Sequence, residues 1–158
     1  MLGRYYFSLL CSSLIAGSAG MAHAQQVSDV PSARERTLLA ESYTSERLWV
    51  WQKRLNLQEW NISVVVVPAG ELKPKTLGNV HWELEKKRAV IRVLDPADYT
   101  LPFNEMLKDM EFTVVHELIH LELAPVLSDL HRSDANRREE EHAVNHVADA
   151  LLNLGRKP

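Results

Sequence analysis

The feature that most constrains this chain is a pair of histidines four residues apart inside an apolar segment. Residues 116–120 read His-Glu-Leu-Ile-His, so His116 and His120 flank Glu117 in the pattern H-E-x-x-H. Because residues i and i+4 lie on the same face of an α-helix, both imidazoles can face one metal ion. Glu117 is turned about 100° from His116 around the helix axis, where it can act as a base on a metal-bound water. A zinc hydrolase needs this arrangement.

The residues around the motif predict that its helix is buried. Residues 112–115 precede it, and the helix is apolar nearly all round because of Leu118, Ile119, Leu121 and Leu123. Two histidines and a glutamate buried without partners would be costly in free energy. A metal ion supplies the missing partner, which favours a metal site over a helix with two incidental histidines.

The composition limits the class of protein. The chain has 158 residues, enough for one domain with one core, and its 46% of hydrophobic residues argues against a disordered chain. The formal net charge is -3 and no basic block is present, so we expect no nucleic-acid partner.

Residues 1–24 have the features of a signal peptide. Arg4 provides a positive charge, residues 7–16 form an apolar run, and residues 22–24 (Ala-His-Ala) match an A-x-A cleavage site. The apolar run is too short to span a bilayer comfortably, which disfavours an uncleaved anchor. We therefore expect cleavage after Ala24, a bacterial periplasmic or secreted protein, and no stable membrane anchor after cleavage.

The only cysteine, Cys11, lies within this predicted signal peptide. Lipid attachment at Cys11 is disfavoured, because Leu9 and Leu10 stand where small residues are expected. A chain cleaved after Ala24 has no thiol, so its core must hold together without disulfides.

The rest of the chain divides into a leader and one domain. Residues 25–33 are polar and contain Pro31, so we expect a flexible leader. Residues 34–158 form the predicted domain, which we assign to the α+β class because helical patterns flank a group of strand patterns.

The first two elements are a long helix and a strand. Hydrophobic residues recur at helical intervals over residues 33–57, although Thr44 or Ser45 can cap a second helix after a break. Residues 60–67 are rich in valine and predict a strand. Its uniformly apolar end favours a central strand that is covered on both faces.

A hairpin and two helices follow. Residues 78–84 and 88–94 predict the two strands of the hairpin, so residues 60–94 should form a largely antiparallel, three-stranded sheet. An edge of such a sheet can take an extended peptide as an extra strand, although charged residues more often only protect an edge. The motif helix should run over residues 103–123 before Pro125, and a last helix over residues 137–154.

A catalytic zinc needs three protein ligands and one open position, so a third ligand must lie downstream. The last helix offers several candidates, namely Glu139, Glu140, Glu141, His142 and His146. The apolar stripe of that helix is formed by Val144, Val147, Ala148 and Leu151. Glu140 and Glu141 lie on or beside this stripe, whereas the other three project from the far side. The spacing alone leaves both Glu140 and Glu141 open.

The two motifs together resemble those of the gluzincin metallopeptidases. The second motif of several minimal, single-domain members is E-x-x-A-[DN]-x-x-A. Glu141, Asn145 and Ala148 match it, and Val144 replaces the usual alanine. The resemblance implies that Glu141 is the third zinc ligand, with Glu140 as the alternative. It also implies that Asn145 hydrogen-bonds the back of a ligand histidine.

The resemblance covers residues 60–154 and implies a minimal zincin-like fold. This fold has an N-terminal helix, a small sheet, an active-site helix and a C-terminal helix that carries the glutamate ligand. The function it implies is hydrolysis of peptide or protein substrates by a water that one Zn2+ activates, with Glu117 as general base.

The sequence does not decide the oxyanion donor, the choice among three functions, or the specificity and oligomeric state. Candidates for a donor to the oxyanion of the transition state are Tyr99, His131, His142 and His146, and the sequence favours none. A zinc-binding module that reads peptides without cleaving them is the alternative function, and a helical scaffold without metal is a third. The cleavage specificity and the oligomeric state do not follow from the sequence.

Overall fold

The computed structural model describes residues 31–128, 130 and 133–155. The signal peptide (residues 1–24) and most of the leader (residues 25–33) lie outside the described residues, so both stay predictions. No described helix is both long and apolar enough to cross a membrane.

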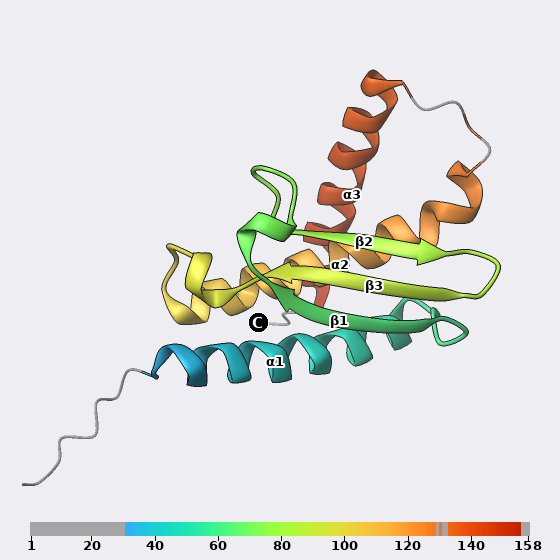
Figure 1. Ribbon diagram of the computed structural model, residues 1–158. Helices are drawn as coiled ribbons and strands as arrows, with labels where there is room; N and C mark the ends of the chain where they lie inside the picture. Colours follow the sequence, from blue (N-terminus) through green and yellow to red (C-terminus); the bar gives the residue numbers. More distant parts are fainter. Residues whose placement is uncertain (1–30, 129, 131–132, 156–158) are drawn as a thin grey trace, which may run out of the picture.

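The described chain is an α+β domain, as the sequence predicted, with its helices packed on one face of a three-stranded sheet (Figure 1). Alternate strand residues such as Val64, Val80 and Ile91 meet all three helices in one hydrophobic core. Two 3-10 turns, η1 and η2, follow β1 and β3. The elements in chain order are α1 (Ala33–Arg54), β1 (Asn61–Val67), η1 (Ala69–Glu71), β2 (Gly78–Glu83), β3 (Arg88–Leu94), η2 (Pro96–Asp98), α2 (Phe103–Leu127) and α3 (Asp134–Gly155).

Helix α1 has strong local signals at both ends. Ser32 and Glu35 form a capping box at its start. At its end Asn56 adopts a left-handed conformation (φ 58°), and the Leu57 amide donates to the Gln52 carbonyl in a Schellman motif. The break considered near Thr44 does not occur, because its hydroxyl donates to a carbonyl within the helix instead of capping a new one.

The sheet is mixed, and its order is β1-β3-β2. β2 pairs with β3 in the predicted antiparallel hairpin, whereas β1 pairs with β3 in parallel. The predicted central position of the first strand is therefore wrong, and β3 is the central strand. Only one face of β1 packs on the helices, so Val65 in its apolar run is 40% exposed. β2 is an edge strand, and its edge faces the cleft described below.

A glycine allows the motif helix to lie directly against β2. A Cβ atom added to Gly78 would lie 2.4 Å from Thr113 Cγ2 of α2 and 2.7 Å from the Arg92 carbonyl oxygen of β3. No side chain therefore fits at Gly78 unless the helix moves away from the sheet. Thr113 is one helical turn before His116, so this contact sets the distance between the motif and the edge strand.

The two final helices are longer than predicted. α2 continues through Pro125 to Leu127, because the fixed φ of proline is compatible with a helix and the missing hydrogen bond falls in the last turn. α3 starts at Asp134, where the preceding Ser133 accepts a hydrogen bond from the Asn136 amide at 3.1 Å.

The expected apolar stripe of α3 is only partly buried. Val144, Ala148 and Leu152 are buried, as the helical period requires. Val147 is 46% exposed, so its assignment to the buried stripe is wrong. The buried side of α3 is therefore narrower than predicted, and Glu140 and Glu141 lie at the edge of that side that faces α2.

Candidate metal centre

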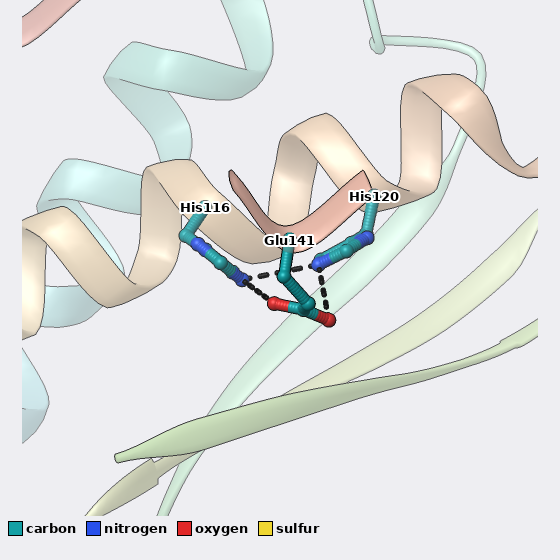
Figure 2. A group of neighbouring side chains, drawn as sticks. All are labelled: His116, His120 and Glu141. Carbon is teal, nitrogen blue, oxygen red and sulfur yellow. Dashed lines mark hydrogen bonds and ion pairs between the residues drawn. The ribbon is translucent and has the colours of Figure 1, made fainter. Parts of the chain in front are cut away.

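Three potential ligand atoms converge where α2 meets α3 (Figure 2). Nε2 of His116 and Nε2 of His120, one turn apart on α2, are 3.0 Å apart. The carboxylate of Glu141 on α3 lies across both rings. One of its oxygens is 3.3 Å from Nε2 of His116, and the other is 3.4 Å from Nε2 of His120.

The far sides of both rings are held by acceptor oxygens. Nδ1 of His116 lies 3.1 Å from Asn145 Oδ1, and Nδ1 of His120 lies 3.0 Å from Glu140 Oε1. An acceptor at Nδ1 stabilises the tautomer that carries its proton there. The Nε2 lone pairs then face each other and the Glu141 carboxylate. Three electron-rich atoms at one point are unfavourable unless a cation lies between them.

The spacing of these atoms fits a metal ion. A tetrahedral zinc with ligands at about 2.1 Å separates them by roughly 3.3 Å. The two Nε2 atoms are 3.0 Å apart, and the two oxygens of Glu141 lie 3.3 and 3.4 Å from one Nε2 each, so these separations are close to those between zinc ligands. His116, His120 and Glu141 can therefore bind a metal ion. Two imidazoles and a carboxylate are a donor set typical of zinc.

The two neighbouring glutamates occupy different places. Glu141 reaches the Nε2 side of the histidines, and its side chain is 56% exposed to the cleft. Glu140 reaches only the Nδ1 side of His120, and its side chain is 10% exposed. Of the two candidates from the sequence, Glu141 is therefore the one that could bind a metal ion together with the histidines, and Glu140 is the acceptor behind His120. Asn145 takes the same place behind His116.

Burial changes the acidity of the motif residues. Glu117 is 7% exposed, and loss of solvent raises the pKa of its carboxyl to about 8. The negative charge of Glu141 raises this pKa further, whereas a hydrogen bond from the Val80 backbone lowers it. Burial also lowers the pKa of His116, with a further lowering from His120, so its ring favours the neutral form that binds metals.

A cleft of about 580 Å3 gives access to the three candidate ligands and to Glu117. Its walls come from the loop before β2, the edge strand β2 itself, and the facing sides of α2 and α3. Trp82 of β2 and Phe112 of α2 provide its large apolar surfaces. The cleft is therefore open along the same edge of the sheet that the hairpin leaves unpaired.

The structure does not bring the proposed oxyanion donors into this cleft. The Tyr99 hydroxyl donates to Asp109 at 3.0 Å, on another part of the molecule. The rings of His142 and His146 lie against each other on the exposed side of α3, with centroids 4.1 Å apart and a tilt of 55°, and neither lines the cleft. His131 lies outside the described residues.

Three cationic residues in the cleft were missed by sequence reasoning. Lys73 and Lys75 lie in the loop before β2, and Arg137 lies in the first turn of α3. Arg137 precedes Glu141 by four residues, so helical spacing alone could have placed it on the same face. The lysines carry no such signal, because only the tertiary structure brings their loop to the cleft.

No protein-family model, curated protein or solved structure matches this chain. The resemblance to gluzincins therefore depends on the two sequence motifs, and the case for a metal site depends on the geometry of its side chains.

Proposed function

We propose that this protein is a zinc-dependent peptidase with Glu117 as its general base. The observation that carries the proposal is the convergence of His116, His120 and Glu141 on one point of an open cleft. A purely structural site would have no need of that opening, because structural zinc sites are closed by protein ligands.

The chain provides a base next to the converging ligands. A zinc ion bound there would lower the pKa of a water molecule towards 7 and polarise a substrate carbonyl. Glu117 lines the same cleft and is buried, so its carboxylate holds a proton strongly. Such a group can accept a proton from water near neutral pH and return it to the leaving amine.

The edge strand offers a support for the substrate backbone. The Leu94 amide donates to the Leu77 carbonyl at 2.9 Å, and antiparallel pairing alternates along a strand. Gly78, Val80 and Trp82 therefore turn their backbone groups away from β3, towards the cleft that they line. The Val80 amide already donates to the Glu117 carboxylate. An extended peptide can therefore pair with the backbone groups of Gly78 and Trp82 and with the Val80 carbonyl, and lie across the metal site.

The substitution Glu117→Gln tests the proposed base. Because the three ligands are unchanged, we expect the variant to bind one zinc ion and to lose about 10²–10⁴-fold in peptide hydrolysis. The measurements are zinc content by elemental analysis and cleavage of a mixed peptide library. Glu122→Gln, an exposed position on the same helix, is the matched control and should keep both properties. Full hydrolysis by zinc-loaded Glu117→Gln would refute the assignment.

The alternative function is a zinc-binding module that holds peptides without cleaving them. The same library decides between the two, because that module would bind peptides along β2 and leave every one intact. Cleavage that a chelator abolishes and added Zn2+ restores would exclude it.

A further inference from the structure

The wall of the cleft carries an excess of cations outside the metal ligands. Lys73, Lys75 and Arg137 line it together with the two ligand histidines. Among the described residues, the only carboxylates that line it are Glu117, Glu140 and Glu141. The loop that carries the lysines and the first half of α3 both extend beyond β2 (Figure 1). The cations thus lie on two walls of one cleft.

The charged groups of these three side chains are not paired with carboxylates of the described residues. Other basic residues, such as Arg47, Lys86 and Lys87, make ion pairs with nearby glutamates. Within the part of the chain that the structure describes, no ion pair joins Lys73, Lys75 or Arg137 to a carboxylate. Their charges therefore stay available to a molecule in the cleft.

A turn in the loop before β2 carries two of these cations, Lys73 and Lys75. The Thr76 amide donates to the Lys73 carbonyl at 3.1 Å, and Lys75 has the left-handed φ of 66° that such a turn requires at its third residue. The turn fixes the backbone of both lysines at the wall of the cleft.

The charges in the metal-loaded cleft do not cancel. This charge balance rests on the proposed function, because it includes the charge of a bound Zn2+. A bound Zn2+ would offset two of the three described carboxylates that line the cleft, Glu117, Glu140 and Glu141, so one negative charge would remain against the three cations. The three cations then leave the cleft with a positive charge, which attracts anions and favours their binding.

We propose that the cleft selects peptides that carry a carboxylate beside the scissile bond, and that Lys73, Lys75 and Arg137 recognise it. Arg137 lies one helical turn from Glu141, so the recognised group sits about 6 Å along α3 from the metal ligand. Its source is either an acidic side chain or the free C-terminus of the peptide, because both present the same carboxylate to a guanidinium or ammonium group.

Binding to zinc-loaded Glu117→Gln tests the proposal without depending on hydrolysis. The probes are three dye-labelled, alanine-rich peptides, measured by fluorescence anisotropy. One has central glutamates and an amidated end, one is neutral with a free C-terminus, and one is neutral and amidated. We expect the third to bind about tenfold more weakly than at least one of the others, with the difference lost near 1 M salt, where the Debye length is about 3 Å.

Substitution of the three cationic residues tests whether they recognise the carboxylate. Lys73→Gln, Lys75→Gln and Arg137→Gln together should remove the preference for the carboxylate peptide. The matched control is Arg34→Gln, Lys108→Gln and Arg138→Gln together, which removes the same charge at exposed positions that do not line the cleft. Equal binding of all three peptides would overturn the proposal. A preference that survives the cleft substitutions, or that the control substitutions remove to the same extent, would also overturn it.

Hydrolysis of the same peptides by the unmodified chain separates this proposal from the proposed function. Cleavage of the carboxylate peptide ahead of the neutral amidated one supports both. Binding preference without any cleavage supports carboxylate recognition and refutes the peptidase. Cleavage of all three peptides at equal rates supports the peptidase and refutes carboxylate recognition.

Discussion

At the scale of single residues, the orientation of each ligand histidine is set by the acceptor behind it. Asn145 and Glu140 hold Nδ1 of His116 and His120, so Nε2 of each ring faces the shared point. The two acceptors differ in charge, because one is an amide and the other a carboxylate. A carboxylate behind a ligand imidazole increases its basicity more than an amide does, so His120 should be the stronger donor of the pair.

Removing the acceptor behind His116 should weaken metal binding. For Asn145→Ala we expect zinc affinity to fall by roughly 10–100-fold, because the ring loses the partner that selects its tautomer. Competition with a chromophoric chelator measures the affinity. Asn153→Ala, at an exposed position on the same helix, should bind zinc as tightly as the unmodified chain. If the two variants bind equally well, Asn145 does not orient His116.

At the scale of elements, the site depends on how closely α2 approaches the sheet. Glu111 anchors the other side of α2 to α1, since it accepts hydrogen bonds from Tyr43 at 2.9 Å and from Trp51 at 2.8 Å. Gly78 removes the side chain that would keep α2 away from β2. Together these contacts hold the motif helix between α1 and the edge strand.

The substitution Gly78→Ala should destabilise the domain. The added methyl group would meet Thr113 and the Arg92 carbonyl at distances that no Cβ tolerates, so we expect a loss of about 2 kcal/mol or more in the free energy of unfolding. Urea denaturation measures this loss. Gly70→Ala is the control, because its added Cβ meets no atom within 4 Å. If Gly78→Ala were as stable as Gly70→Ala, the close contact between Gly78 and α2 would not limit the stability of the domain.

At the scale of the whole molecule, a bound metal would join two helices that are otherwise held by few contacts. Of the described residues of α3, only Val144, Ala148 and Leu152 are buried. The candidate ligands His116 and His120 come from α2, and the candidate ligand Glu141 comes from α3. A metal that binds only the folded chain therefore stabilises the packing of α3 on the rest of the domain.

Removing the metal should lower the melting temperature of the protein. At a free zinc concentration about 100 times the Kd, binding contributes about 2.7 kcal/mol, which corresponds to a shift of roughly 10 °C for a domain of this size. Thermal unfolding with and without a chelator measures this shift. Glu141→Gln should abolish most of it, whereas Glu139→Gln, an exposed neighbour, should keep it. An identical shift in both variants would exclude Glu141 as a ligand.

The sequence by itself determined the features that depend on local geometry. The i, i+4 spacing put His116 and His120 on one face of a helix, and the alternation of residues 78–94 defined the hairpin. The apolar period of the last helix also placed Glu140 and Glu141 beside its buried side. Each of these features follows from the residue periodicity within a helix or strand, so it does not depend on how that element packs against the rest of the domain.

The tertiary structure alone decided what depends on how elements meet. The order of the strands follows from the parallel pairing of β1 with β3, which no local pattern encodes. Which of the two glutamates reaches the Nε2 atoms follows from the rotation of α3 against α2, since adjacent residues of a helix differ by about 100°. The lysines reach the cleft because a distant loop packs there, and a contact between segments far apart in sequence leaves no periodic signal.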